Sequence, residues 1–539
     1  MRTSNVNFPT SYFLCYCFLF FSSVSWRNIW AESGSQEERF LQCLHDYHQS
    51  NTKLVFTPND SSYNSIFLSS VQNLRLRSPL EQKPLVIVTP INYLQVQSVV
   101  TCAKVNKMRV RTRGGGHDYE GLSSISYYKN SPFVLIDLKK LRSISINTKA
   151  KTAWVEGGGT LGQLYYKISQ KSQNLGFPAG LCPTVGVGGH LSAGGEGTLS
   201  RKYGIAADHI IDAKVVNANG EILDRKSMRE DLFWAIRGGG GASFGVILAY
   251  KISLVHVPSV VTVFTVNKTL EQNATKLVHL WQTIAPKLNR DLFIRIRVDP
   301  GTTKNGKTTV EIKFNSIFLG RADKLLLVMK ESFPELGLKR SDCKEMTWIE
   351  SALYFSDLPS GSTVKDLART TPYPNDYYKA KSDYVIEPIP EAAFEGLWKR
   401  FMASPAPRPQ LIFAPYGGRM AEISESEIPF PHRAGNLFQI QYLVSWDAEE
   451  NADSHNHIDW IREAYEYMAS FVSKSPRLAY YNYRDLDLGF NEEENISFED
   501  SAWGFKYFKN NFYRLARDKA AVDPTNFFRY ELSIPPLES

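Results

Sequence analysis

Apolar and polar residues alternate along residues 436–446, NLFQIQYLVSW, more clearly than elsewhere in the chain. Because strand side chains point alternately to two faces, one face carries Phe438, Ile440, Tyr442, Val444 and Trp446. Gln439 and Gln441 share the other face with Leu437 and Leu443. The pattern predicts a strand whose aromatic face packs on a core. Its glutamine face then meets water, a polar layer or a ligand.

Residues 84–255 predict short strands separated by helices and glycine turns. PLVIVTP (84–90) and KMRVRT (107–112) are expected to be strands, and residues 91–106 between them show helical spacing. The apolar side of that helix is expected to carry Val96, Val99, Val100 and Ala103. Further strands are expected in 134–138, 152–159 and 213–224, with a hairpin turn at Asn219-Gly220. A short helix at 231–236 precedes a glycine turn and a long strand.

After Pro258 the pattern changes. Strands are expected at 260–266, 292–298 and 308–320, with a helix near 269–289 and helical stretches to about residue 403. The C-terminal segment, 480–536, is aromatic and compact rather than tail-like. Because strands and helices are expected both before and after Pro258, the sequence indicates an α+β protein.

Composition narrows the class of protein. The 539 residues are enough for two to four domains, and 43% apolar residues support sizeable cores. The net charge of +7 is spread thinly and forms no basic stripe, which argues against nucleic-acid binding. Of 35 glycines, 23 lie between residues 114 and 245, so backbone in that region is expected to approach a ligand closely.

The N-terminus predicts secretion. The apolar run YFLCYCFLFF (12–21) follows Arg2 and is too short to span a bilayer, so residues 1–31 are expected to be a signal peptide. No later stretch predicts a membrane span, and no metal-ligand spacing occurs. The protein is expected in the secretory pathway, with the extracellular space (apoplast) or vacuole as its destination. Four glycosylation sequons begin at Asn59, Asn267, Asn273 and Asn495.

Two glycine-rich loops carry the candidate chemistry. RTRGGGHDYEG (111–121) follows a strand, and successive glycine amides form an anion-binding nest that suits a diphosphate. The alternative for this loop is a tight turn around a structural histidine. GLCPTVGVGGHLSAGGEG (180–197) holds seven glycines, one cysteine and one carboxylate. Of the mature chain's four cysteines, spacing alone leaves three pairings open.

Six segments occur in a characteristic order: RGGGHDYEG, CPTVGVGGH, RKYGIAADHIIDA, DLFWAIRGGGGASFGV, NYRDLDLG and PTNFFRYELSIPP. Together they closely resemble the plant berberine bridge enzyme-like FAD-linked oxidoreductases of the vanillyl alcohol oxidase/p-cresol methylhydroxylase superfamily. The resemblance covers the chain from about Cys43 to Pro536. It implies a two-part FAD-binding domain, 32–258 completed by the C-terminal segment 474–539. An α/β substrate domain with a large antiparallel sheet, 259–473, is inserted between them.

The resemblance implies FAD attached covalently through two side chains. His117 matches the histidine bonded to the flavin 8α-methyl, and Cys182 matches the cysteine bonded to flavin C6. Cys43 and Cys102 match a disulfide pair, which leaves Cys343 free. The other residues expected to bind FAD are Arg113, Gly114, Gly115, Gly116, Asp118, Thr184, Gly186, Gly189, His190, Ser192, Val246 and Asn482.

The resemblance also implies catalytic roles. Tyr483 matches the catalytic tyrosine, whose ordinary pKa near 10 is high for a base, and a nearby Arg484 is expected to lower it. Gln439 and Gln441 are expected to line the substrate site. Val185 matches the position that controls oxygen access, where valine is typical of oxidases.

Glu196 departs from the family, which commonly has an aromatic residue here. Its carboxylate is expected to bind a cationic amine, act as a second base, or turn to solvent. The leading hypothesis is a secreted, monomeric FAD oxidase of a phenolic, prenylated phenolic or alkaloid metabolite. It passes hydride to flavin N5 and reduces O2 to H2O2, with oxidative cyclisation as one outcome. The alternatives are a carbohydrate oxidase and a Diels–Alder cyclase that keeps FAD as a structural element.

Overall fold

The computed structural model describes residues 34–47, 53–77, 82–303, 305–370, 376–493 and 496–537. The expected signal peptide and the sequon at Asn495 lie outside these residues. Asn59, Asn267 and Asn273 are exposed. Among the described helices, none combines the length and hydropathy needed to cross a bilayer.

Within the described residues, the N-terminal part contains two larger sheets and one two-stranded pair. The first has the order β1 (Val55–Phe56), β2 (Val86–Val88), β4 (Phe133–Asp137) and β3 (Arg109–Arg113), in which β2, β4 and β3 run parallel. Helix α4 (Tyr93–Val105) connects β2 to β3 and buries Val96, Val99, Val100 and Ala103, which confirms the predicted face. A disulfide joins Cys43 of α2 (Gln36–Tyr47) to Cys102 of α4.

The second sheet has five strands. Its order is β5 (Ile144–Asn147), β6 (Thr152–Glu156), β10 (Val246–Ser253), β8 (Ile210–Val216) and β9 (Ile222–Leu223). Gly220 has a φ of 76° in the predicted β8–β9 hairpin, a conformation that favours glycine. Helices of this part are α3 (Tyr63–Leu68), α5 (Leu161–Ser169), α6 (Val187–Ser192), α7 (Ser200–Tyr203) and α8 (Glu230–Ala235). Strand β7 (Leu175–Gly176) pairs antiparallel with β11 (Val255–His256) in a separate two-stranded sheet.

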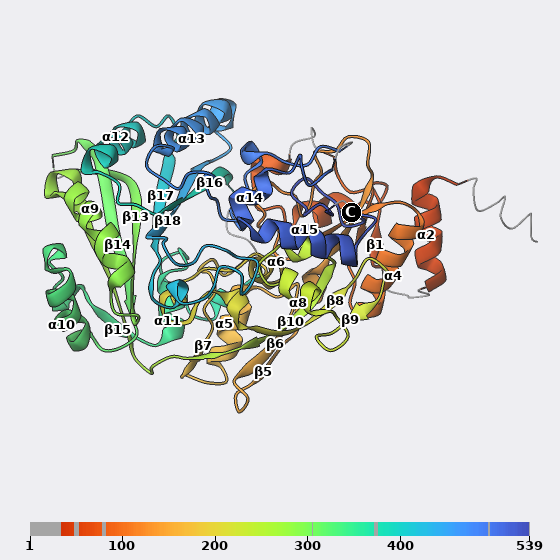
Figure 1. Ribbon diagram of the computed structural model, residues 1–539, viewed down its shortest axis with the longest axis horizontal. Coiled ribbons are helices and arrows are strands. Elements are labelled where there is room, and N and C mark those ends of the chain that lie inside the picture. The colour runs from red at the N-terminus through yellow and green to blue at the C-terminus, as the bar shows by residue number, and fades with distance from the viewer. Residues whose placement is uncertain are drawn as a thin grey trace, which may run out of the picture.

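The middle of the chain forms one seven-stranded antiparallel sheet (Figure 1). Its order is β15 (Lys344–Met346), β12 (Val261–Thr269), β14 (Thr308–Phe318), β13 (Leu292–Thr302), β17 (Arg408–Pro415), β18 (Phe438–Trp446) and β16 (Tyr377–Val385). The helices that accompany it are α9 (Ala274–Ile284), α10 (Ala322–Ser332), α11 (Trp348–Tyr354), α12 (Glu391–Met402) and α13 (Ser454–Met468). Strand β16 lies within the stretch expected to be helical, so that expectation is wrong there.

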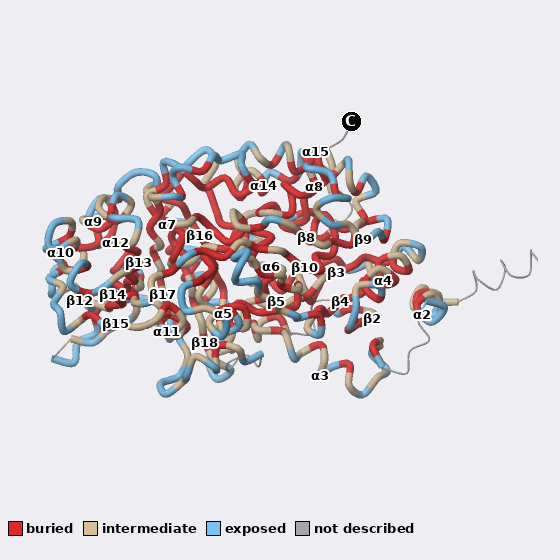
Figure 2. The backbone as a smooth tube through the Cα atoms, turned by 90° about the horizontal axis from the view of Figure 1, so that it is seen from below, coloured by how far each residue is buried: buried red, intermediate tan, exposed pale blue. Residues whose placement is uncertain are grey.

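The seven-stranded sheet has two different faces. Phe438, Ile440 and Tyr442 pack in one core with residues of α9, α12 and α13, as the alternation predicts. The opposite face of β13, β17 and β18 turns towards the N-terminal part and carries the glutamines. The buried residues follow the strands of all the sheets, whereas exposed residues lie mainly in peripheral helices and loops (Figure 2).

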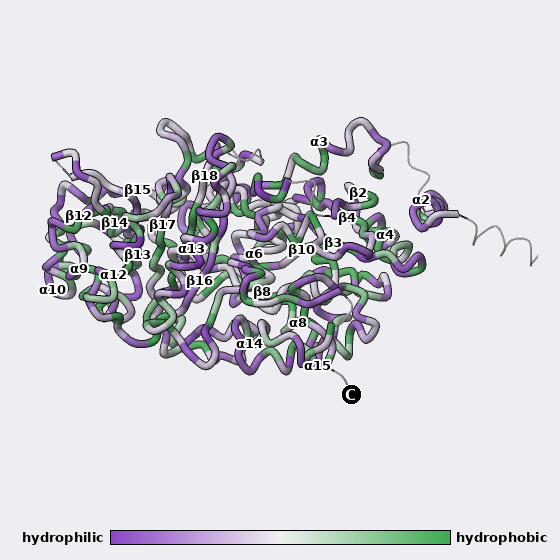
Figure 3. Tube along the Cα trace, turned by 90° about the horizontal axis from the view of Figure 1, so that it is seen from above, coloured by the Kyte–Doolittle hydropathy of each residue, from purple (hydrophilic) through white to green (hydrophobic). Residues whose placement is uncertain are grey.

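The C-terminal segment returns to the N-terminal part. Helix α15 (Asn511–Val522) packs against α8, helix α14 (Trp503–Phe508) packs against α15, and aromatic residues of both share a core with α8. Hydrophobic residues are concentrated in the strands of both parts, with hydrophilic residues towards the outside (Figure 3). The fold is α+β with a large antiparallel sheet, as predicted.

Candidate functional site

A cavity of about 590 Å³ lies between the glutamine face of the seven-stranded sheet and the glycine loops. All five predicted catalytic residues line it: Tyr483, Glu196, Gln439, Gln441 and Val185. So do most residues expected to bind FAD: Gly114, Gly115, Gly116, His117, Asp118, Cys182, Thr184, Gly186, Gly189, His190, Ser192 and Asn482. Segments more than 360 residues apart in the sequence thus meet at one site.

Arg113 and Val246 do not line the cavity. The Arg113 guanidinium is fully buried, donates to Asp137 at 2.8 Å and also contacts the carbonyl oxygen of Phe67. Val246 is buried in the core beneath the parallel sheet. The alternation of each strand, β3 for Arg113 and β10 for Val246, points the two side chains into the protein interior instead.

The two glycine loops are packed backbone against backbone. A Cβ atom on Gly115 would lie 2.4 Å from the amide nitrogen of Gly186, and one on Gly186 would lie 2.3 Å from the nitrogen of Gly115. Only glycine permits this approach. Gly189, by contrast, faces open cavity space, and a Cβ atom at this position would meet nothing within 4 Å. The loops therefore form a narrow bare-backbone cradle, which fits the phosphates of a dinucleotide.

His117 and Cys182 stand on opposite loops of this cradle. His117 Nε2 lies 2.9 Å from the Thr184 hydroxyl, and burial lowers the pKa of the imidazole to about 4. Cys182 is a free cysteine exposed to the cavity, and the surrounding protein raises the pKa of its thiol. A neutral imidazole and a free thiol next to the cradle fit the expected flavin, whose two attachment points need such nucleophiles.

Tyr483 belongs to an aromatic cluster at the cavity wall. Its ring meets Tyr119 and Tyr480 edge-to-face, with centroids 5.6 and 5.0 Å apart. Burial, together with the negative charge of Glu196, raises the pKa of Tyr483 well above 10. Arg484 does not reverse this, because it donates to Asp118 at 2.6 Å and stacks on Tyr481. The expectation that Arg484 lowers the pKa of Tyr483 is therefore wrong.

Glu196 points into the protein rather than to solvent. The hydroxyls of Tyr416 and Tyr384 both donate to its Oε1. No described residue donates to Oε2, and Glu196 lines the cavity. Burial raises its pKa to about 7, although the two tyrosine hydrogen bonds act in the opposite direction. A carboxylate with this pKa is suited to accept a proton at neutral pH.

Replacing Tyr416 with phenylalanine is expected to raise the pKa of Glu196 further, because the ionised carboxylate loses a hydrogen-bond donor. The expected shift is about one to two pH units, since one charge-assisted hydrogen bond contributes roughly 1.5–3 kcal/mol and one pH unit corresponds to about 1.4 kcal/mol. The measurement is the pH dependence of kcat/KM, whose acid limb should move to higher pH. Y384F should shift it less, since its hydroxyl lies 3.4 Å from Oε1. An unchanged acid limb in Y416F would contradict the role of this contact.

Gln439 and Gln441 are buried, so the solvent alternative for their face is wrong. Gln439 donates to the Tyr384 hydroxyl at 3.1 Å, and Gln441 donates to the Tyr119 hydroxyl at 2.7 Å. Gln410, on the adjacent strand, also lines the cavity. Gln439 thereby extends the network that holds Glu196.

Several residues at the site were not expected from the sequence. Arg295 of β13 lines the cavity and donates from Nε to Asn315 at 2.8 Å. Tyr119 and Tyr378 form part of the same wall, with ring centroids 5.6 Å apart. The alternation LFIRIRV signals that Arg295 opposes the apolar face, but the residues that it faces come from distant segments.

Comparisons with known proteins relate the chain to FAD-binding families. Residues 84–225 match the family described as FAD binding domain, and residues 479–535 match the family described as berberine and berberine like. A tetrahydroberberine oxidase of Berberis wilsoniae is 51% identical over 94% of this chain and 96% of its own length. A monolignol oxidoreductase of Arabidopsis thaliana is 48% identical over 93% of each chain.

Solved structures share the fold. Berberine bridge enzyme-like protein 28 from Arabidopsis thaliana has a TM-score of 0.87 and 47% identity, covering 93% of this chain and all of the other. The grass pollen allergen Phl p 4, a glucose dehydrogenase, has a TM-score of 0.88 and 42% identity, covering 93% and 100%. An isoleucine-to-valine variant of that allergen is a glucose oxidase (TM-score 0.87, 43% identity, 93% and 100% coverage).

Proposed function

Because the chain belongs to the berberine bridge enzyme-like family of FAD-linked oxidoreductases, we propose that it is a secreted FAD-dependent oxidase of a basic plant metabolite. Its substrate is an amine of the alkaloid type, and O2 is the electron acceptor. The observation that carries this proposal is Glu196, a carboxylate that lines the cavity and whose Oε1 accepts from two tyrosine hydroxyls.

The cavity suits a flat organic cation. Aromatic side chains from both halves of the molecule form much of its wall, including Phe293, Phe355 and Tyr480. Ring faces attract cations, and a carboxylate in a site of low dielectric pairs with them strongly. The cavity also contains Arg295, and the Asp357 carboxylate nearby, which pairs with Arg297 at 2.9 Å, attracts that guanidinium as well. The name of the tetrahydroberberine oxidase relative agrees with an amine substrate.

Glu196 has two tasks in this proposal. Its ionised form pairs with the substrate ammonium, and Oε2 then accepts the proton from nitrogen. The lone pair set free on nitrogen assists departure of hydride from the adjacent carbon, which yields an iminium ion two hydrogens lighter than the ammonium. FAD, when bound, supplies the hydride acceptor, and O2 takes up the two electrons as H2O2. Tyr483, with its raised pKa, stays protonated and donates a hydrogen bond rather than acting as the base.

The cofactor is proposed to be attached through His117 and Cys182. Thr184 engages His117 Nε2, which leaves Nδ1 for the bond to the flavin. The glycine loops at 114–116 and 186–189 hold the diphosphate. We further propose domain boundaries near residues 258 and 473, a monomeric state, and export to the apoplast or vacuole.

Val185 is proposed to control oxygen access, so V185L is expected to slow reoxidation of the reduced enzyme by O2. One added methylene in a close-packed pocket changes a rate by roughly tenfold or more. In Phl p 4, exchange of one isoleucine for valine likewise accompanies oxidase activity. Stopped-flow mixing of reduced enzyme with air-saturated buffer measures this rate. The anaerobic reduction rate serves as the internal control, and a V185L enzyme that reoxidises at the wild-type rate would contradict the assignment.

Carbohydrate oxidation is the second candidate, favoured by Gln410, Gln439 and Gln441 along one sheet face. A pair of ligands separates the two: a tertiary amine and its carbon isostere, which share shape but not charge. The proposal predicts that the amine binds at least tenfold more tightly at pH 8, followed by perturbation of flavin absorbance, and that E196Q removes the preference. Equal binding of the pair, together with turnover of glucose, would favour the carbohydrate candidate.

A further inference from the structure

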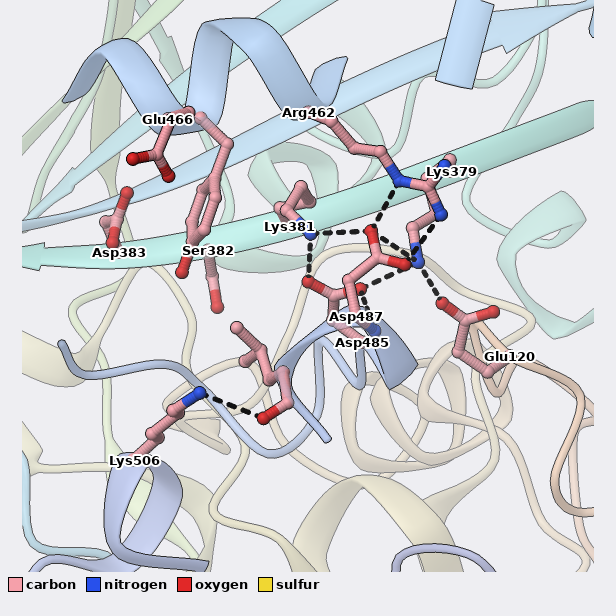
Figure 4. A network of polar contacts seen from close by, with 12 residues as sticks. Glu120, Lys379, Lys381, Ser382, Asp383, Arg462, Glu466, Asp485, Asp487 and Lys506 are labelled. Carbon is pink, nitrogen blue, oxygen red and sulfur yellow. Dashed lines mark hydrogen bonds and ion pairs between the residues drawn. The ribbon is translucent and has the colours of Figure 1, made fainter. Parts of the chain in front are cut away.

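Five charged residues, four of them buried, meet in one cluster of ion pairs (Figure 4). Lys379 and Lys381 extend from β16, Asp485 and Asp487 come from the C-terminal segment, and Glu120 comes from the first glycine loop. We call these five residues the anchoring cluster. The side chains of Lys379, Lys381, Glu120 and Asp485 are each no more than 4% exposed. Three segments that are remote in sequence therefore meet through charges.

Lys379 is the centre of the cluster. Its ammonium donates to Glu120 and, at 2.7 Å, to Asp485 Oδ1. Burial alone would lower the pKa of Lys379, but the carboxylates of Glu120 and Asp485 reverse this and raise it. Lys381 donates to the other oxygen of Asp485 at 2.5 Å and to Asp487 at 2.9 Å. At the rim, Arg75 donates to Glu120 at 2.8 Å, and Arg462 donates to Asp487 at 2.8 and 3.0 Å.

The position of these charges on the sheet is unusual. Lys379 lies opposite Val444 of β18, and Lys381 lies opposite Tyr442. Val444 and Tyr442 belong to the apolar core of the sheet's covered face. Apolar residues at positions 379 and 381 would continue that core, and replacing a buried ion pair with apolar residues is often stabilising. The cluster is therefore poorly explained by stability alone.

Each segment of the cluster carries a cavity tyrosine beside its charge. Tyr119 precedes Glu120, Tyr378 precedes Lys379, and Tyr483 lies two residues before Asp485. In β16 the alternation of side chains places Tyr378 towards the cavity when Lys379 faces the cluster. The three rings meet at Tyr119, which contacts both Tyr378 and Tyr483 edge-to-face at 5.6 Å.

The C-terminal segment is fastened to β16 at two points. Arg477 donates to both oxygens of Asp383 at 2.7 Å, and Asp485 and Asp487 accept from Lys379 and Lys381. The residues between these points include Tyr480, Asn482 and Tyr483, all of which line the cavity. Fixing both ends of a short segment restricts where its middle can lie.

We propose that the anchoring cluster, with Lys379 at its centre, is a positioning device that sets the placement of Tyr119, Tyr378 and Tyr483 on the cavity wall. Charge pairs suit this task because they are directional and join only at matched positions, whereas apolar contacts allow sliding. The proposal rests on the proposed function, since it treats these three tyrosines as the surface that orients the substrate. Lys379 acts through the tyrosines and does not touch the substrate.

The test is K379M in the flavin-loaded, full-length enzyme. Methionine keeps much of the volume of lysine but removes its charge, so Glu120 and Asp485 lose their shared partner. A displacement of about 1 Å at a reacting group costs on the order of 100-fold in rate. We expect the rate of anaerobic flavin reduction per bound flavin to fall 10- to 100-fold, with ligand Kd changed less than threefold. K379R should restore part of the rate.

Two controls separate positioning from stability. V444A removes volume opposite Lys379 on the same face, and it should lower Tm while the reduction rate per bound flavin stays within twofold. E120Q, a milder variant, should act in the direction of K379M if K379M does not fold. A K379M enzyme that loses Tm like V444A but reduces flavin at the wild-type rate would overturn the proposal.

A crystal structure of K379M supplies a readout that does not depend on the reaction. The proposal expects the Tyr119–Tyr483 centroid distance to depart from 5.6 Å by about 1 Å or more. A Tyr119–Tyr483 centroid distance that stays at 5.6 Å in K379M would overturn the proposal even if the rate falls. If E196Q proves fully active, the proposed function fails, but the positions of the tyrosines in K379M still decide this inference.

Discussion

Replacement of Glu196 with glutamine is expected to lower kcat/KM for a basic substrate by about 100- to 1000-fold, the usual contribution of a positioned general base. Glutamine keeps the shape of glutamate and can still accept from Tyr416 and Tyr384, but it neither carries charge nor takes a proton. Stopped-flow measurement of anaerobic flavin reduction gives the effect on the chemical step. Activity of the wild type should rise with pH through the Glu196 pKa of about 7, since only the ionised carboxylate is active.

The pH profile distinguishes a base from a residue that only shapes the cavity. In E196Q the acid limb near pH 7 should vanish, and the remaining activity should rise as the substrate amine loses its own proton, because the free amine already carries the lone pair that assists hydride departure. D376N provides the matched control, because it removes a partly exposed carboxylate charge at the cavity without touching Glu196, and it should change the rate less than threefold. An acid limb that persists unchanged in E196Q would assign the proton transfer to another group.

The double variant H117A/C182A is expected to lose covalently held flavin completely. Each single variant should keep flavin on the polypeptide after acid precipitation, because the remaining loop still supplies one nucleophile. In the double variant both loops retain their glycine cradle, so flavin should bind but pass into the supernatant on denaturation. Absorbance of pellet and supernatant near 450 nm measures the distribution.

C343A serves as the control for cysteine loss, because Cys343 is free but lies in the core of the seven-stranded sheet. This variant should keep all its flavin in the pellet. Wild-type protein that releases its yellow colour on precipitation would contradict attachment through both side chains. Release from C182A alone would leave His117 without its proposed role.

Strands with apolar residues on one face were predictable from the sequence, whereas β16 was not. The aromatic face of β18 packs against helices, so its period of two is visible in the residues themselves. The segment YYKAKSDYV of β16 hides the same period, because its covered face carries lysines and an aspartate whose partners lie about 100 residues away. A sequence does not show whether a charged residue is buried or exposed, and only the fold distinguishes the two cases.

The part of the site formed by local sequence motifs was predictable from the sequence. The glycine loops bring His117 and Cys182 to one cavity, because the close approach of the two backbones requires glycines that are visible in the sequence of each loop. The environment of Glu196 was not predictable, since Tyr416 and Tyr384 approach from separate strands and strand ends of the sheet. For the same reason Arg484 was assigned to its neighbour Tyr483, whereas it pairs with Asp118, 366 residues away.

Product mass combined with H2O2 release, measured with a tertiary amine of the alkaloid type, tests the central claim most directly. We predict an iminium product two hydrogens lighter than the substrate ammonium, with one H2O2 formed for each product. A product with the summed mass of two reactants and no H2O2 would instead identify a cyclase. H2O2 formed with glucose while the amine is returned unchanged would equally contradict amine oxidation as the function of this protein.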